Sequence, residues 1–307
     1  TGPVRDSDAS FPNSVSSRSG RPWPDGRNEV RAGDGGWISR RPASGEPILS
    51  PGSDVVHLWW IPIPTTTLPP TVAAPRSGSG APWPPLDGLT AAERARALRF
   101  REPADRARFL LARLAIRDLS ARYTGFPPEK LDLVPRERGK PELQADGEPL
   151  SLRVNLSHSG RWAILAFASH REVGVDLEEA RPLSEPSALA TFILHAEEVA
   201  QLRSSLPPFP LQRFFQGWTR KEALVKAMGR GIDREAASLR AGIDTSRLTL
   251  RLPTPWTVVS IAAPPGYHAA VALEGEMLVP KVMGVLDLQA GGRVSAGWAP
   301  RPPDGGP

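Results

Sequence analysis

Apolar and polar positions along the chain predict a mixture of strands and helices. The run from Val55 to Ile61 is short, mostly apolar and rich in β-branched and aromatic residues, which is typical of a buried strand. Similar patterns predict strands at 152–156, 162–168, 172–178, 248–252, 256–261 and 268–273. Because no regular strand–helix–strand rhythm joins these segments, we predict an α+β fold.

Helices are predicted between the strands. Thr90, with Glu93 three residues later, forms a capping box that opens a helix to about residue 100. Pro103 suits the first turn of a second helix, to about residue 123, in which apolar residues recur every four positions from Leu111. Two further helical segments are expected over about 187–204 and 211–228, and the second of these stops at Gly229.

The two ends of the chain lack such periodicity. Residues 1–53 are rich in Pro, Gly, Ser and Arg, which predicts a disordered leader. We expect order from residue 54, a proline-rich loop over 62–86 and a flexible tail over 281–307.

Composition narrows the classes of function. The 307 residues include no cysteine, which excludes a disulfide framework, a zinc–thiolate site and a cysteine nucleophile. The net charge of +5 favours anionic partners: nucleic acid, acidic proteins or phosphorylated small molecules. The apolar runs are too short to span a bilayer, and the N-terminus lacks the pattern of a signal peptide. We therefore expect a cytoplasmic protein without a membrane partner.

Two carboxylates are predicted to share one face of a strand. In the stretch Gly174-Val-Asp176-Leu-Glu178, residues two apart project to the same side, so Asp176 and Glu178 would lie side by side. Neighbouring carboxylates repel each other, and a magnesium ion between them is a natural remedy because it prefers oxygen ligands. The alternative is a strand end whose two acids face water.

A third acid is predicted on the long helix near residue 222. Trp218, Glu222 and Lys226 recur at four-residue spacing with Lys221 beside them, so a carboxylate flanked by two amines could serve a metal and a polyphosphate. Taken alone, the Glu222–Lys226 spacing more often marks a pair on an exposed helix surface.

A polar turn and an arginine-rich surface are the remaining candidates. Ser157 and His158 lie between two apolar strands, where they and free backbone N–H groups could hold a phosphate; an ordinary Ser/Gly hairpin turn is the alternative. The simplest interpretation of the arginines on the first two helices is a solvated basic face. These arginines are Arg94, Arg96, Arg99, Arg101, Arg106, Arg108 and Arg113.

Taken together and in this order, the motifs resemble the Sfp-type 4′-phosphopantetheinyl transferase family. The resemblance runs from about residue 56 to residue 273, and its most diagnostic parts are the acidic strand and the helix around residue 222. It is carried by Arg138-Gly139-Lys140-Pro141, Val154-Asn-Leu-Ser157-His158-Ser-Gly160, Gly174-Val-Asp176-Leu-Glu178, and the stretch from Trp218 to Gly231.

The resemblance implies an enzyme that transfers the 4′-phosphopantetheine arm of coenzyme A to a serine of an acyl or peptidyl carrier protein. It implies dependence on Mg²⁺ and release of 3′,5′-ADP. It also implies two similar α+β halves in a pseudo-twofold arrangement, here about 54–171 and 172–280, with coenzyme A in the cleft between them. We expect a monomer that binds carrier proteins and no nucleic acid.

The resemblance further implies roles for individual residues. Asp176, Glu178 and Glu222 would bind Mg²⁺ on the pyrophosphate, Glu222 would take the proton of the carrier serine, and Lys226 would stabilise phosphate charge. Further contacts to coenzyme A would come from Ser157, His158 and Lys221, with Arg138, Gly139, Lys140 and Pro141 along the adenine. Arg96 would meet the 3′-phosphate, with Arg94 as the second choice.

Two positions depart from the family's pattern. Thr191-Phe192 stands where many members carry two phenylalanines before an acidic stretch, which leaves the role of Glu197 or Glu198 and part of the carrier-docking surface open. Phe109 stands where some members have a hydroxyl residue near the phosphates, so one phosphate contact would have to come from elsewhere.

Three other classes compete with this interpretation. A nucleic-acid-binding protein would suit the positive charge and the nine tryptophans, but the tryptophans do not interleave with a basic cluster. A metal-dependent phosphohydrolase could use the same three acids, but nothing else supports water as the nucleophile. A catalytically silent relative would bind coenzyme A alone, and the intact acids argue against it.

Overall fold

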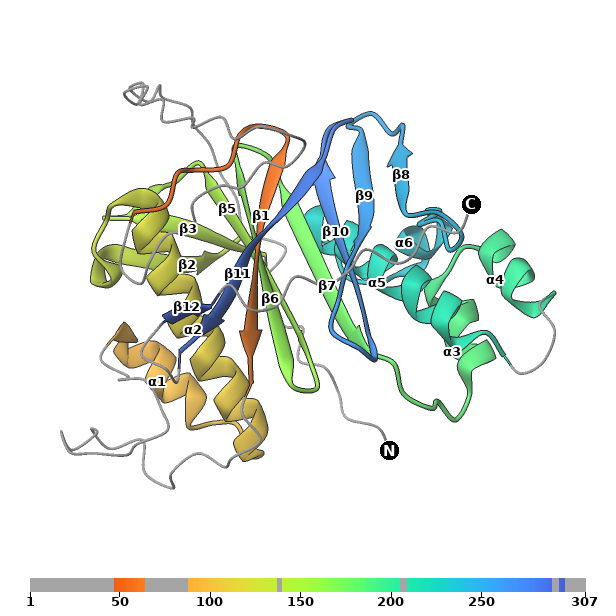
Figure 1. The fold of residues 1–307 in the computed structure, drawn as a ribbon, viewed down its shortest axis with the longest axis horizontal. Helices are drawn as coiled ribbons and strands as arrows, with labels where there is room; N and C mark the ends of the chain where they lie inside the picture. Colours follow the sequence, from red (N-terminus) through yellow and green to blue (C-terminus); the bar gives the residue numbers. More distant parts are fainter. Residues whose placement is uncertain (1–46, 64–87, 137–139, 205–208, 289–292, 296–307) are drawn as a thin grey trace.

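The described residues form four layers in the order helix, sheet, sheet, helix (Figure 1). The structure is a computed structural model that describes residues 47–63, 88–136, 140–204, 209–288 and 293–295. A smaller sheet of three strands, β2 (Leu131–Pro135), β3 (Pro141–Ala145) and β4 (Glu148–Pro149), lies beside the first helix layer. Helices and sheets without a repeated βαβ unit confirm the predicted α+β class.

The first sheet is built around a strand that is buried on both faces. Its spatial order is β12 (Arg293–Ser295), β11 (Val279–Asp287), β1 (Val55–Pro62), β6 (Trp162–Ser169) and β5 (Leu152–Ser159). Trp59 and Trp60 are both 0% exposed and belong to different core clusters, because successive strand residues point to opposite faces. The nearly continuous apolar sequence of β1 follows from this burial on both sides.

Two helices cover the outer face of the first sheet. α1 (Ala91–Ala97) starts with the predicted capping box: the N–H of Glu93 donates to Thr90 Oγ1, and the N–H of Thr90 donates to Glu93 Oε2. α2 (Pro103–Thr124) has its proline in the first turn, as predicted, and ends at Gly125 with a left-handed φ of 76°. Its leucines pack with Trp59 in one core.

The second sheet is antiparallel and carries the long helix α5 (Leu211–Ala227). Its spatial order is β7 (Val173–Glu179), β10 (Tyr267–Glu274), β9 (Trp256–Ile261) and β8 (Arg247–Leu250). Ala223 and Ala227 of α5 pack against Ala270 and Ala272 of β10, and these small side chains let the helix lie close to the sheet. Beside α5 lie the short helices α3 (Pro186–Ile193), α4 (Ala196–Arg203) and α6 (Arg234–Ser238).

The ordered region extends beyond the predicted residues 54–280 at both ends. Ile48 lies inside the predicted leader, yet it is only 6% exposed and its N–H donates to the carbonyl of Arg122 at 2.9 Å. The predicted tail contains most of β11, which pairs in parallel with β1, with Val282 opposite Leu58 and Val285 opposite Trp60. The rest of the leader (1–46), most of the loop (64–87) and parts of the tail (289–292, 296–307) lie outside the described residues.

The single helical segment predicted over 187–204 is two helices. Leu194 has an extended backbone (φ −97°, ψ 161°), and His195 then caps α4 through a capping box with Glu198. The small sheet of β2, β3 and β4 was not predicted. None of the helices in the described part of the chain is long and apolar enough to cross a membrane.

Candidate active site

Side chains join the facing edges of the two large sheets. β5 is an edge strand of the first sheet and β7 is an edge strand of the second. From residue 153 to residue 159, every second side chain of β5 bonds to β7 or to the residue before it. The pairs are Arg153 Nε to Glu172 Oε1 (3.1 Å), Val175 N to Asn155 Oδ1 (2.9 Å), Ser157 Oγ to Asp176 Oδ1 (2.9 Å) and Ser159 Oγ to Glu178 Oε2 (3.2 Å). We call this row of contacts the β5–β7 seam.

The acidic face of β7 is turned toward α5, as the period-two pattern predicts. Val173, Val175 and Leu177 are buried in the core between the two sheets, so the alternate residues face the helix. A Cβ at Gly174 would lie only 2.1 Å from the carbonyl oxygen of Ala223, so the strand and the helix touch backbone to backbone. This close approach brings Asp176 within reach of α5.

Lys226 of α5 forms an ion pair with Asp176. Its Nζ lies 2.5 Å from Asp176 Oδ1 and 3.1 Å from Ser157 Oγ, which itself donates to the same carboxylate oxygen. Asp176 is 2% exposed, and its second oxygen, Oδ2, is buried and has no hydrogen-bond partner among the residues that the structure describes. A buried carboxylate oxygen without a partner is costly and is well suited to accept a cation or a donor from a ligand.

The other two predicted metal ligands act on the same lysine. Desolvation favours a lower pKa for Lys226, but the charges of Asp176, Glu222 and Glu178 outweigh it and raise the pKa above its ordinary value. The charges of all three acids therefore act on one ammonium group, and Asp176 contacts it directly. Within the described residues, no three side chains of His, Asp or Glu stand close enough to form a metal site as they are.

A cavity of about 280 Å³ lies next to these residues. Three of the predicted coenzyme A contacts line it: Arg96, Pro141 and His158. Two more arginines, Arg108 and Arg113, line it as well, which makes it a place for an anion.

The sequence alone favoured a solvated basic face for the arginines of α2, whereas two of them, Arg108 and Arg113, line the cavity. The helix contributes residues at the spacing of one helical face: Asp105, Arg108, Phe109, Ala112, Arg113 and Ile116. Arg96 and Arg113 both lie over the ring of Phe109, at 5.5 and 5.4 Å from its centre. Phe109 thus orients two arginines of the cavity. In the sequence, the sign of this wall is that arginines share one helical face with the apolar residues Phe109 and Ile116.

His158 joins the cavity to the acid–lysine cluster. It lines the cavity, and it directly follows Ser157, which bonds both Asp176 and Lys226. Desolvation and the positive charges of Arg108 and Lys226 lower the pKa of His158. The charges of Arg108 on α2 and of Lys226 on α5 therefore both act on the imidazole.

Lys221 does not belong to this site. Its side chain is 0% exposed, and its Nζ donates to the carbonyls of Ala236, Ala237 and Leu239. The prediction that Lys221 contacts coenzyme A is wrong because neighbouring helix residues point about 100° apart, so Lys221 cannot share the direction of Glu222.

Lys140 is also engaged elsewhere. Its Nζ donates to Glu172 Oε2 (2.6 Å) and to the carbonyls of Val173 (3.0 Å) and Ala227 (2.9 Å), which uses all three ammonium protons. Pro141 does line the cavity, whereas Lys140 anchors the strand that carries it. Arg138 and Gly139 lie outside the described residues.

Glu198, whose role the sequence left open, is a buried anchor. It is 1% exposed and accepts hydrogen bonds from the backbone N–H groups of His195, Ala241 and Gly242. Glu197 is instead exposed and pairs with Arg240 at 2.9 Å.

Comparison with known proteins identifies the family. A model of the 4′-phosphopantetheinyl transferase superfamily matches residues 172–272, and a model of the N-terminal part of 4′-phosphopantetheinyl transferase matches residues 85–170. The 4′-phosphopantetheinyl transferase HetI of Nostoc sp. is 34% identical over 238 residues, which cover 76% of this chain and 94% of HetI. The chain belongs to the 4′-phosphopantetheinyl transferase superfamily.

Other transferases of this family match shorter parts of the chain. AcpT of Salmonella typhi is 36% identical over 155 residues, covering 47% of this chain and 78% of AcpT. A 4′-phosphopantetheinyl transferase of Bacillus subtilis is 28% identical over 169 residues, covering 55% of this chain and 73% of the relative. The enzyme class, a phosphopantetheinyl transferase, is thereby confirmed.

The two family matches divide the site between them. The cavity, from Arg96 to His158, lies within the N-terminal match, and the acid–lysine cluster, from Asp176 to Lys226, lies within the C-terminal match. The candidate site therefore includes residues from both sides of the β5–β7 seam.

Proposed function

We propose that this transferase moves the 4′-phosphopantetheine arm of coenzyme A onto a serine of an acyl or peptidyl carrier protein and releases 3′,5′-ADP. The position of His158 carries this proposal. It ends an arginine-lined cavity and adjoins, through Ser157, the cluster of Asp176 and Lys226. A phosphorylated nucleotide in the cavity would present its next phosphates to that cluster.

The cavity would take the nucleotide end of coenzyme A. Arg96, Arg108 and Arg113 supply positive charge for phosphate groups, and the cavity is large enough for one end of the substrate rather than for all of it. Pro141 would lie against the adenine. Arginine suits this task because its planar fork can bond two phosphate oxygens at once.

The acid–lysine cluster fits a magnesium ion in its donor chemistry. Asp176, Glu178 and Glu222 offer carboxylate oxygens, which Mg²⁺ prefers, and no described residue donates a hydrogen bond to the buried Asp176 Oδ2. When bound, the ion would offset the negative charge of the pyrophosphate. Lys226 now holds Asp176 Oδ1, so its ammonium group would move toward the phosphate as the substrate enters.

The residues of the chain would then act as follows. The carrier serine Oγ attacks the β-phosphorus, a phosphorus–oxygen bond to the serine forms, and the bond from that phosphorus to the bridging oxygen breaks. Glu222 accepts the proton of the serine hydroxyl. Lys226 and His158 stabilise the negative charge on the phosphate oxygens, and 3′,5′-ADP leaves with the bridging oxygen.

The carrier protein would be bound in part by the basic face of α1 and the start of α2. Arg99 and Arg101 are exposed in the connection between these two helices. Charge complementarity with an acidic carrier helix would raise the rate of encounter, and salt would weaken it. The Michaelis constant for the carrier should therefore rise with salt concentration, and a salt-independent value would count against this surface.

The test is modification of an unmodified carrier protein, measured by intact mass. With coenzyme A and Mg²⁺, the carrier should gain one phosphopantetheine, and the gain should disappear with EDTA or with Asp176→Ala. Glu222→Gln should fold normally and lose turnover. The control is Asp146→Asn, an exposed acid paired with Lys130 on the small sheet, which should keep full activity. No mass gain over a panel of acyl and peptidyl carriers would refute the proposal.

A further inference from the structure

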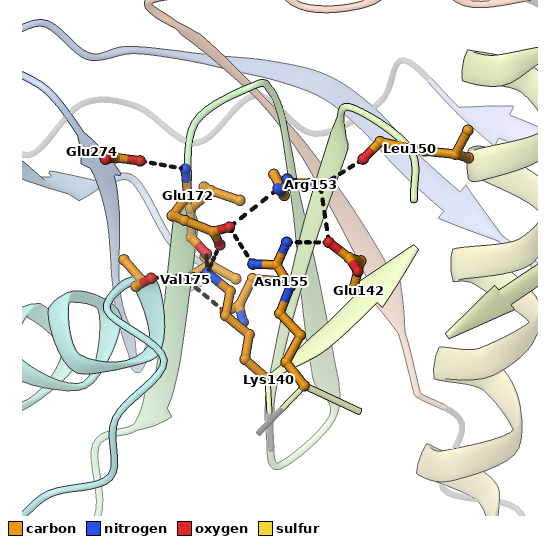
Figure 2. Close-up of polar contacts among 11 residues, drawn as sticks. Lys140, Glu142, Leu150, Arg153, Asn155, Glu172, Val175 and Glu274 are labelled. Atoms are coloured by element: carbon orange, nitrogen blue, oxygen red, sulfur yellow. Dashed lines mark hydrogen bonds and ion pairs between the residues drawn. The ribbon is translucent and has the colours of Figure 1, made fainter. Parts of the chain in front are cut away.

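Glu172, just before β7, forms ion pairs with three positively charged side chains. It accepts hydrogen bonds from Lys140 Nζ (2.6 Å), Arg136 Nη1 (2.8 Å) and Arg153 Nε (3.1 Å), and all three donors belong to the first half of the chain (Figure 2). Desolvation favours a higher pKa for the Glu172 carboxyl, but the three cations outweigh it and lower the pKa. Glu172 is thus the acceptor that ties these cations to the second half.

Two of these cations directly precede residues of the cavity wall. Lys140 comes before Pro141, and Arg153 comes before Val154 and Asn155, which all line the cavity. Because adjacent strand residues share a rigid backbone, a fixed Lys140 or Arg153 side chain fixes the wall that follows it. The two arginines also bond Glu142, so strands β3 and β5 are held together as well as to β7.

Lys140 extends the same connection to α5. Its third hydrogen bond goes to the carbonyl of Ala227, at the C-terminal end of the helix and one residue after Lys226. A cation is favoured at this end because helix dipoles leave it negative. Glu172, Lys140 and the helix end therefore form one connected unit next to the ion pair of Lys226 and Asp176.

We propose that Glu172 is a positioning residue for coenzyme A binding: through Lys140 and Arg153 it holds the cavity walls formed by Pro141, Val154 and Asn155 in place. The inference rests on the proposed function, because it assumes that coenzyme A enters this cavity. Without the carboxylate charge, Arg136, Lys140 and Arg153 would repel one another more strongly, although Glu142 would still pair with the two arginines. The walls would then move apart, and the nucleotide would lose contacts.

The test compares the affinity for coenzyme A with the rate of turnover. Glu172→Gln keeps the shape of the side chain and removes its charge. The Kd of coenzyme A, measured by calorimetry without a carrier, should rise about tenfold, below the ~10²-fold that a 1 Å misplacement can cause. The KM for coenzyme A should rise in parallel, while kcat at saturating coenzyme A and the KM for the carrier should stay near wild type.

A second variant and a control keep the test decisive. Arg153→Gln removes one arm of the cluster and should raise the Kd by a smaller factor; it decides the matter if Glu172→Gln does not fold. Asp146→Asn breaks an exposed ion pair on the same small sheet and should leave the Kd unchanged. An unchanged Kd in folded Glu172→Gln, or in Arg153→Gln where the first variant fails to fold, would overturn the inference.

The outcomes also separate this inference from the proposed function. If wild-type protein does not bind coenzyme A, the proposed function and the inference both fail. If wild type and Glu172→Gln bind it equally and both modify a carrier, the inference alone fails. A lower melting temperature with an unchanged Kd would show that the cluster serves stability only.

Discussion

A side chain at position 174 would collide with the backbone of α5. An ideal Cβ on Gly174 would lie 2.1 Å from the carbonyl oxygen of Ala223 and 2.4 Å from the nitrogen of Ala227. Because the shortest ordinary carbon–oxygen contacts are about 3.3 Å, Gly174→Ala would push β7 and α5 apart by about 1 Å. Neither helix atom can rotate out of the way, since both are main-chain atoms.

The displacement should reduce both stability and turnover. Overpacking of this kind costs about 1–3 kcal/mol, and each kcal/mol lowers Tm by roughly 2–4 °C in a domain of about this size, so we expect a fall of about 2–12 °C. Asp176 and Glu178 lie on β7, whereas Glu222 and Lys226 lie on α5. Separating these pairs by about 1 Å should lower turnover by about 10²-fold.

Two assays check this expectation: thermal unfolding followed by circular dichroism, and carrier modification followed by intact mass. Gly52→Ala is the matched control, because its Cβ would meet nothing nearer than a Val55 side-chain carbon at 3.8 Å, an ordinary contact. Wild-type Tm and wild-type turnover in Gly174→Ala would refute the close approach. A lower Tm with full turnover would refute the claim that the strand–helix distance controls catalysis.

Three further substitutions test other parts of the structure. Burial and the charge of Lys281 lower the pKa of His57 to about 3, whereas an unfolded histidine has a pKa of about 6.5. Only the unfolded chain binds this proton between those values, so the unfolding free energy should fall as pH drops from about 6.5 to 3, by up to about 1.4 kcal/mol per pH unit. His57→Gln should flatten this slope in urea titrations; identical slopes would contradict the assignment. Lys221→Met should lower stability by about 1–3 kcal/mol because three carbonyls lose their donor, with turnover per folded molecule unchanged; reduced turnover at full stability would return Lys221 to the active site. Ser159→Ala removes the hydrogen bond to Glu178 and should lower kcat about tenfold, at an unchanged KM for coenzyme A; an unaffected kcat would contradict a positioning role.

The sequence was most informative where a local pattern decides the structure. The apolar run at Val55, the capping box at Thr90 and the alternation around Asp176 each depend on neighbouring residues, and all three are confirmed. The placement of Asp176 near Lys226 could also be anticipated, because the two motifs that carry them occur together in one family.

Contacts between distant segments could not be predicted from the same patterns. Lys221 is next to Glu222 in the sequence. The direction of its side chain is nevertheless set by the segment around Ala236, whose carbonyl groups accept hydrogen bonds from the buried ammonium group. The sequence predicts a flexible tail where β11 lies, because the segment from about Pro280 has Gly and Pro at both ends and only weak periodicity. Its structure depends on a long-range pairing with β1 that leaves no periodic signal.

The contacts of Lys140 are a second example of long-range partners that the sequence could not predict. A lysine in a motif that resembles a nucleotide-binding stretch suggests a ligand contact, whereas here its ammonium group is satisfied by Glu172 and two carbonyls. These partners lie after residue 171, and they come close to Lys140 only because the β5–β7 seam holds the two large sheets together.

The parallel pairing of β1 with β11 has a consequence for the order of events during synthesis. β1 is the first strand of the described chain to leave the ribosome, and its neighbour β11 is nearly the last. Until β11 is made, β1 keeps an open edge of backbone N–H and C=O groups beside Trp59 and Trp60, which is a hazard for aggregation. The nascent protein therefore needs nearly its full described length before this edge is closed.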